Sequence, residues 1–281
     1  MKIKHLLTLA ALSVSLHINP ALGQDNITIV APTSEAADGL DLQAVSELFA
    51  ETKNLEDFEK ALNDPDEGLN NLDLDGNGEV DYIRLVEEVA NDAHLIILQA
   101  AIGPDEFQDV ATIEVEKSGD NYTMQVHGNV LIYGENYYYH PTHVHIHTWP
   151  IITWIFRPAY RPYHSRFYFG FYPRWWHPFH PLHHTVYRNR VVRYTGRNTF
   201  VAKHVSRVHT INRFNYKPHT SKKVTNRVTV RHNGRTTTVK KTKKVTHHRN
   251  GNTTVKRTKK VTTKKNGRKK TVKKTRVKKK R

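Results

Sequence analysis

The sequence contains no cysteine, which excludes a disulfide framework, a thiolate nucleophile and a cysteine-based zinc site. Acidic residues are absent from the whole chain after Glu135, so the C-terminal half cannot supply the paired carboxylates that many hydrolases use. No segment reaches the roughly 18 consecutive apolar residues of a membrane-spanning helix. Because only 37% of the residues are apolar, a hydrophobic core must be confined to part of the chain.

The two halves of the chain carry opposite charge. Residues 1–135 hold all 26 acidic residues and six of the 44 Lys and Arg, a net charge of −20, whereas residues 136–281 carry a net charge of +38. The overall charge of +18 therefore describes neither half. Such opposite charges predict attraction within one molecule or self-association between molecules.

The N-terminus has the pattern of a secretory signal peptide over residues 1–23. Lys2 and Lys4 precede a short apolar run from Leu6 to Leu16, and Ala21-Leu22-Gly23 is a small-residue cleavage site. This predicts an exported protein, periplasmic or secreted, with no cysteine for a lipid anchor. Residues 24–40 are polar and small, which predicts an irregular leader.

Residues 41–132 predict an acidic α+β domain. Helical spacing of apolar residues predicts two short helices, the first from Asp41 and the second capped by Asn54. Four antiparallel strands are then expected as a meander, at residues 80–88, 95–102, 110–117 and 122–126. Helical spacing is an alternative for the first strand. The second reads as fully buried, and the third should have one solvent-exposed face bearing Thr112, Glu114 and Glu116.

Residues 133–187, the seam segment, are rich in aromatic residues, Pro and His. Seven prolines exclude a regular helix or central strand over most of the segment, and we expect one short strand at residues 151–156. The aromatic side chains are expected to pack on the N-terminal sheet or on one another. The alternative is a surface that stacks on sugars or lies at a lipid headgroup boundary. The aromatic residues concerned are Tyr168, Tyr172, Trp175, Trp176 and Phe179.

Residues 188–281 form a basic tail with an internal repeat of 16 to 17 residues. Asn-Gly pairs at 233, 250 and 266 between Thr- and Val-rich runs predict hairpins. The first would place Val228 opposite Val239 and the third Val261 opposite Val272, while the middle unit is offset by one residue. With 26 Lys or Arg in the last 61 residues, we expect disorder until an anion neutralises the charge.

The tail cations are expected to bind anionic polysaccharide, lipid headgroups or nucleic acid without sequence preference. The repeats mark the following anion-binding candidates: Lys240, Lys241, Lys243, Lys244, Lys256, Arg257, Lys259, Lys260, Lys273 and Lys274.

An acidic loop at residues 73–81 carries the strongest motif. Asp73, Asp75, Asn77, the Glu79 carbonyl and Asp81 occupy positions 1, 3, 5, 7 and 9 of a calcium loop. Hard oxygen ligands around a sharp turn suit Ca²⁺, and the stretch resembles an EF-hand loop over about twelve residues.

The loop departs from the EF-hand pattern at its end. Gly78 and Val80 fit positions 6 and 8, but Arg84 stands at position 12, where a bidentate Glu normally closes the site. Either another carboxylate, such as Glu87 or Glu88, closes the site, or calcium binds weakly. The alternative is an Asx-rich turn that needs no ion.

A wider resemblance extends from about residue 70 to 185. The runs VDYIRLVEE, HLIILQA and EFQDVATIEVEK, with the later YGENYY and WWHPFHP, look like a group of poorly characterised secreted bacterial proteins. The resemblance implies export but no established activity.

His143, His145 and His147 alternate along the seam segment and, if extended, share one face. Neutral imidazoles can hold Zn²⁺ or Cu²⁺. Successive members would lie about 6.5–7 Å apart along a strand, so a transition-metal site needs a bend. The alternative is a polar segment that binds metals only opportunistically.

No catalytic set stands out in the sequence. Ser165 lies beside His164 and Arg166, without the context of a nucleophile elbow or an orienting acid. We therefore expect a non-enzymatic, exported structural or interaction protein with a weak calcium loop and a cationic tail. A nonspecific binder of extracellular DNA is the alternative, and a hydrolase comes third.

Overall fold

The computed structural model describes residues 36–143, 145–208, 214–227, 229–232, 235–247, 253–265 and 268–280. The predicted signal peptide and most of the predicted leader lie outside these ranges. A single 3₁₀ turn, η1 (Ala36–Gly39), is the first described element. None of the helices in the described ranges is long and apolar enough to cross a membrane.

Both predicted N-terminal helices are present. Helix α1 (Leu42–Glu51) begins after Asp41, whose carboxylate accepts hydrogen bonds from the next helical N–H groups. Helix α2 (Leu55–Asn63) begins after Asn54, whose side chain accepts from the Asp57 N–H at 2.8 Å. Side-chain capping of orphan amides therefore fixes both helix starts where the sequence places them.

A six-stranded antiparallel sheet follows, in the simple order of the chain. The α+β class is confirmed, but the predicted four-stranded meander is too small. Two additional strands come from the seam segment and from the basic tail. The strands are β1 (Tyr82–Ala90), β2 (Ala93–Gly103), β3 (Glu106–Ser118), β4 (Asn121–Gly128), β5 (Tyr138–Pro141) and β6 (Phe200–Lys203).

The first sheet strand, for which a helix was the alternative, is extended and pairs with β2 along its full length. Strand β2 is buried at every position, as its continuous apolar run predicts. Its two faces meet different partners. Ile96 and Leu98 join the main core, whereas Leu95 and Ile97 pack with Phe214 from the basic half.

The prediction of a solvent-exposed face on β3 is wrong. Thr112 and Glu114 are only 4% and 2% exposed. The Glu114 carboxylate accepts hydrogen bonds from the Thr112 hydroxyl at 2.9 Å and the Gln125 amide at 2.6 Å. Gln125 in turn accepts from the backbone N–H of Arg207. We call residues 206–208 and 214–221, which cover this face of the sheet, the strap.

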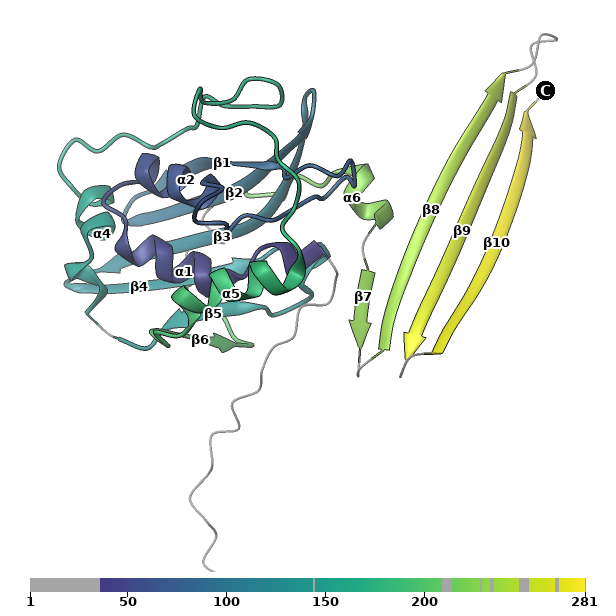
Figure 1. Ribbon diagram of the computed structural model, residues 1–281. Helices are drawn as coiled ribbons and strands as arrows, with labels where there is room; N and C mark the ends of the chain where they lie inside the picture. The colour runs from purple at the N-terminus through teal and green to yellow at the C-terminus, as the bar shows by residue number, and fades with distance from the viewer. Residues whose placement is uncertain are drawn as a thin grey trace, which may run out of the picture.

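Helices lie against the other face of the sheet, where Figure 1 shows α1, α2 and α5 in front of the strands. A short helix forms at Pro150–Ile155, so the strand predicted at 151–156 is wrong. Pro150 suits the first turn of a helix because that position needs no N–H donor. The remaining helices are α3 (Val130–Tyr133), η2 (Ile146–Thr148), α4 (Pro150–Ile155), α5 (His184–Thr195) and α6 (Lys222–Arg227).

One buried core contains residues from Ala37 to Val224 and so continues across the segment boundaries placed after residues 132 and 187. Tyr187 of α5 illustrates the contact, because its hydroxyl accepts a hydrogen bond from the Asp41 N–H at 2.8 Å. Packing therefore joins the seam segment and the first part of the basic half to the acidic domain predicted at residues 41–132.

A second antiparallel sheet, the tail sheet, contains four strands in the order β10-β9-β8-β7. Val261 lies opposite Val272, in the register that the repeats predict. Between β8 and β9 the register pairs Val239 with Val261 and Val245 with Val255, which removes the offset of the middle unit. The strands are β7 (Thr229–His232), β8 (Arg235–His247), β9 (Thr253–Lys265) and β10 (Arg268–Lys280).

Val228 and the Asn-Gly pairs lie outside the described residues, so the pairing of Val228 with Val239 stays a prediction. The same holds for the expectation that the tail is disordered without an anion.

Candidate functional site

The acidic loop connects α2 to β1 and folds onto its own amides. The Asp73 carboxylate accepts from the N–H groups of Gly76 at 2.6 Å and Gly78 at 3.2 Å. The side chains of Asp75 and Asn77 each accept from the N–H two residues on. Gly76 and Gly78 have φ values of +81° and +92°, which glycine alone adopts easily. This geometry suits both a calcium loop and an Asx-rich turn.

Asp81 is the buried member of the acidic loop, with 5% of its surface exposed. Its carboxylate accepts from the Leu74 N–H at 2.6 Å. Burial, followed by repulsion from Asp75 and Asp73, raises the pKa of Asp81 to about 8. Burial and the neighbouring carboxylates therefore disfavour the ionised form of Asp81, and a cation in the loop would favour it.

Lys223 of α6 already supplies one positive charge to the loop. Its ammonium lies 3.4 Å from the Asp75 carboxylate and 3.2 Å from that of Glu106, and it donates to the Ile102 carbonyl at 2.9 Å. The basic half of the chain therefore contacts the acidic loop directly, at one of its expected ligands.

Arg84, at position 12, lies on β1 and points away from the loop, donating to the Ser165 carbonyl at 3.1 Å. Of the two alternatives, closure of the site by Glu87 or Glu88 does not fit the structure. Both continue along β1, which carries them roughly 20 Å from Asp81 at about 3.3 Å per residue. Glu87 is instead fully buried and bonded to His94, with an Nδ1–Oε1 distance of 2.7 Å.

Within the described ranges, no group of three or more His, Cys, Asp or Glu is arranged to hold a metal ion. The Glu79 side chain is exposed, and its N–H donates to Asn77. The side chains of His143, His145 and His147 are also exposed, and the 3₁₀ turn at Ile146–Thr148 prevents the alternating face of an extended strand. Calcium and transition-metal binding both stay predictions.

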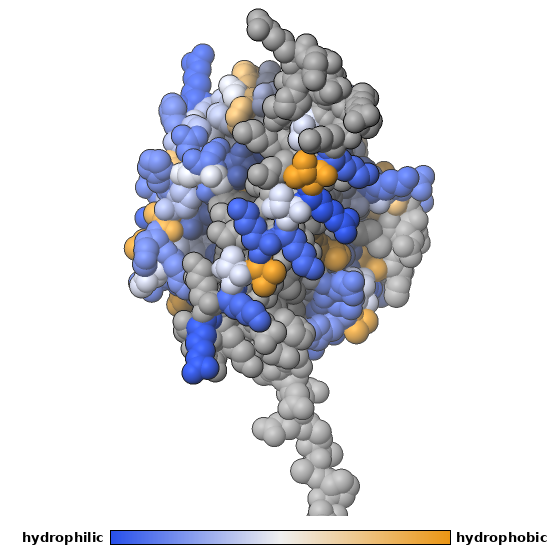
Figure 2. Space-filling view, turned by 90° about the vertical axis from the view of Figure 1, so that its right-hand side faces the viewer, coloured by the Kyte–Doolittle hydropathy of each residue, from blue (hydrophilic) through white to orange (hydrophobic). Residues whose placement is uncertain are grey.

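The tail sheet aligns like residues in rows across its strands. The register joins Lys240 to Lys260 and Lys260 to Lys273. The next row joins Lys241, Lys259 and Lys274, and another joins Lys243, Arg257 and Arg276. Lys244 lies opposite Lys256. The cationic rows lie in adjacent pairs, with a threonine row between the two pairs and valine at Val239 and Val245 on either side. On the tail-sheet side of the molecule, Figure 2 shows predominantly hydrophilic residues among those coloured, with scattered hydrophobic ones.

Opposed cations destabilise an antiparallel pair, because the facing side chains are about 5 Å apart. The described tail strands contain no Asp or Glu to compensate. Every tail cation that the repeats single out lies within this paired array. The arrangement concentrates positive charge that an external polyanion would neutralise.

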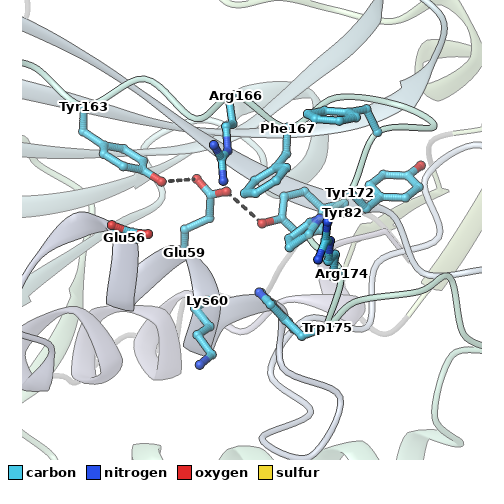
Figure 3. A pocket seen from close by; sticks show the side chains of 12 residues that line it. Glu56, Glu59, Lys60, Tyr82, Tyr163, Arg166, Phe167, Tyr172, Arg174 and Trp175 are labelled. Carbon is cyan, nitrogen blue, oxygen red and sulfur yellow. Dashed lines mark hydrogen bonds between the residues drawn. The ribbon is translucent and has the colours of Figure 1, made fainter.

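A cavity of about 540 Å³, the aromatic pocket, opens between α2, the start of β1 and the seam segment. Figure 3 shows Glu59 of α2 between Tyr163 and Tyr82. Twelve residues line the cavity: Glu56, Glu59, Lys60, Tyr82, Tyr163, Arg166, Phe167, Phe171, Tyr172, Pro173, Arg174 and Trp175.

Glu59 anchors the pocket and is only 2% exposed. One carboxylate oxygen accepts from the hydroxyls of Tyr82 at 2.8 Å and Ser165 at 2.7 Å. The other accepts from the Leu85 N–H at 3.0 Å and the Tyr163 hydroxyl at 3.4 Å. Burial raises the pKa of Glu59, while these hydrogen bonds oppose the rise. The carboxylate thus ties α2 to β1 and to the seam segment.

The edge of β1 receives the seam segment directly. The Glu87 N–H donates to the Tyr163 carbonyl, and the Ser165 N–H donates to the Leu85 carbonyl, both at 2.9 Å. This pairing covers an otherwise open sheet edge and positions the next residues over the pocket. Ser165 therefore acts as a structural donor to Glu59.

The sequence interpretation missed this pocket. One signal was available, because Glu59 lies four residues after Leu55 and three before Leu62, on the apolar face of α2. A carboxylate on such a face must find hydrogen-bond donors when it is buried. The donors from Tyr163 and Ser165 lie about a hundred residues later in the chain, which local patterns do not reveal.

Comparison of the chain with protein families, curated proteins and solved structures finds no match. The resemblance to secreted bacterial proteins gains no support from these comparisons and stays a hypothesis.

Proposed function

We propose that the chain is an exported, non-enzymatic binding protein whose basic tail attaches it to anionic polymer of the cell envelope or extracellular space. The observation that carries the proposal is the register of the tail sheet, in which Lys240, Lys260 and Lys273 form one of several cationic rows. An anionic chain lying across the strands would neutralise charges that otherwise repel one another.

The acidic loop contributes a weak calcium site in this proposal. Support comes from the placement of Asp73, Asp75 and Asp81 in one loop, where burial of Asp81, followed by repulsion from Asp75 and Asp73, raises its pKa to about 8. With no carboxylate at position 12, we expect an affinity of the order of 10⁻⁴–10⁻³ M. Bound calcium would stiffen the connection between α2 and β1.

The salt dependence of binding tests the role of the tail. The full mature chain should bind anionic polysaccharide, duplex DNA and anionic vesicles alike. Its affinity for each should fall steeply with added salt, because binding releases counterions. A flat salt dependence would contradict the proposal. Strong preference for one DNA sequence would favour the alternative of a nucleic-acid-binding protein.

A further inference from the structure

The aromatic pocket presents flat apolar surfaces at several angles. Among the rings that line it, Tyr82 lies against Phe167 with ring centroids 5.9 Å apart and planes at 75°, and against Tyr172 at 5.8 Å and 42°. Phe171 and Trp175 remain 47% and 41% exposed at the mouth. Aromatic side chains that stay this exposed while lining a cavity indicate a binding surface, although one face of Phe171 also stacks on Tyr168 at 5.2 Å.

Unpaired cations surround these rings. Lys60, Arg166 and Arg174 are exposed, and within the described ranges none of them forms an ion pair with a carboxylate. Of the two acidic residues that line the pocket, Glu59 is committed to four internal donors. Glu56 alone is left exposed at the mouth, so the accessible charge is positive.

We propose that this pocket binds an acidic sugar residue of an anionic polysaccharide. An aromatic ring can stack on the C–H face of a pyranose, and an arginine can bind its carboxylate through two parallel hydrogen bonds. Glu56 and Lys60 offer an acceptor and a donor for hydroxyl groups. The volume of about 540 Å³ is within the range of small-ligand sites.

The proposal rests on the proposed function for the class of polymer and adds a site that selects within that class. The tail would attract any anionic polymer through its charge, whereas the pocket offers rings and cations in fixed positions. The fixed positions come from Glu59, since its buried carboxylate holds Tyr82, Tyr163 and Ser165 together. Preorganised polar groups give specificity because little entropy is lost on binding.

A lipid surface is the alternative partner, and the exposed residues of the turn near the pocket distinguish it from a sugar. Tyr168 and Phe169 are 51% and 38% exposed beside Gly170, yet neither lines the cavity. Insertion into a headgroup layer would use these outward side chains, whereas a sugar in the pocket would contact Phe171 and Trp175. The two partners thus predict different sensitive residues.

Calorimetric titration of the full mature chain with a galacturonate trimer tests the proposal. At about 0.5 M salt the screening length is only about 4–5 Å, which suppresses binding by the tail. Trp175→Ala and Arg174→Ala should each weaken trimer binding at least tenfold. The matched controls Phe169→Ala and Arg161→Ala, outside the pocket lining, should leave it unchanged. A neutral galactose trimer should bind at least tenfold more weakly.

Equal binding of the acidic and neutral trimers, or wild-type affinity in both pocket variants, would overturn the proposal. So would binding to phosphatidylglycerol vesicles that Phe169→Ala abolishes and Trp175→Ala does not, because that pattern indicates a lipid surface. Binding of long polygalacturonate at low salt tests the tail separately. If the wild type binds the polymer but not the trimer, the pocket proposal is rejected and the role of the tail stands. If it binds the trimer but not the polymer, the role of the tail is rejected.

Discussion

The described residues between 36 and 227, which we call the head, and the tail sheet differ in how their charges are neutralised. In the head, acidic side chains accept hydrogen bonds from the basic half. Asp109 accepts from the Tyr216 hydroxyl at 2.9 Å and the His219 N–H at 2.7 Å, and Glu106 accepts from the Ser221 hydroxyl at 2.7 Å. In the tail sheet, cations face cations.

This difference indicates separate roles for the acidic residues of the head and the basic residues of the tail. The acidic residues of the head act as anchors for a strap and helices that come from the basic half. The described tail strands contain no Asp or Glu, so no carboxylate within them can pair with the tail cations, and under our proposal an external polyanion neutralises this charge. The change from internal neutralisation to the external neutralisation that we propose therefore falls after residue 227.

Neutralising the cationic rows should have the largest effect. The sixfold variant carries glutamine at Lys240, Lys241, Lys259, Lys260, Lys273 and Lys274. Each removed cation should reduce the slope of log affinity against log salt by about 0.9 for duplex DNA, or by about 5 in all. We expect at least a hundredfold loss of affinity at about 0.1 M salt, measured by fluorescence anisotropy.

The threonine rows supply a matched control for this variant. Serine at Thr238, Thr242, Thr258, Thr262, Thr271 and Thr275 changes the same strands without changing charge. This control should keep both the slope and the affinity. An unchanged slope in the glutamine variant would mean that the cationic rows do not bind the polymer.

Breaking the internal neutralisation should cost folding stability instead. Glu59→Ala leaves the Leu85 N–H and the hydroxyls of Tyr82 and Ser165 without their acceptor, which should lower the free energy of unfolding by roughly 3–5 kcal/mol. Glu59→Gln retains one carbonyl oxygen and should cost less. Urea denaturation measures both, and Glu56→Ala, one turn earlier and exposed, should change stability by less than about 0.5 kcal/mol.

The same contrast explains what the sequence could predict. Caps at Asp41 and Asn54, the apolar run of β2 and the valine match in the repeats are local signals, and each gives the observed element. Strand β6 and the strap are long-range features. Their residues carry no apolar alternation, and the partners that hold them lie about 60 or more residues away, such as β5 for β6 and Gln125 for Arg207.

Burial of Glu114 on β3 shows the same limit. The alternation correctly predicts that Glu114 and Ile113 point to opposite faces of the sheet. It also favours a solvent-exposed face for Glu114, because acidic residues are rarely buried without a partner. The amide of Gln125 and the strap provide that environment. Likewise, prediction of the pocket requires recognising that Glu59, on the apolar face of α2, is buried and must accept hydrogen bonds from residues distant in the sequence.

His140 is a buried group whose protonation should depend on cations from the basic half. It is 1% exposed on β5, and neither ring nitrogen has a hydrogen-bond partner among the described residues. Burial, followed by the charges of Arg207 and Lys203, lowers the pKa of His140 to about 4. Since the pKa is about 6.5 when unfolded, the neutral ring stabilises the fold above pH 6.5, and this stability is lost as pH falls toward 4.

His140→Leu should therefore flatten the acid side of the stability curve. The decline in unfolding free energy between pH 7.5 and pH 4 should be smaller than in the wild type by about 2–3 kcal/mol. His204→Leu, at an exposed position, is the matched control and should follow the wild-type curve. Parallel curves for His140→Leu and wild type, from denaturation at each pH, would show that His140 does not titrate on unfolding.

Calcium should have the smallest effect, because it competes with an internal cation. At an affinity of about 10⁻³ M, 5 mM calcium stabilises the fold by about 1 kcal/mol, or about 2–4 °C in melting temperature. Asp73→Ala should abolish this shift, whereas Asp120→Ala, at an exposed turn outside the acidic loop, should retain it. An identical wild-type melting temperature in calcium and in chelator would reject the site.

Lys223→Met sharpens this last test. The Lys223 ammonium lies 3.4 Å from the Asp75 carboxylate, so an ion bound to Asp75 must share or displace it. Removing the ammonium should raise the calcium-induced shift in melting temperature while lowering the melting temperature in chelator, because the internal cation is lost. A loop that is only an Asx-rich turn predicts the second change without the first. Melting of both proteins in calcium and in chelator therefore distinguishes a binding loop from a turn neutralised by the chain itself.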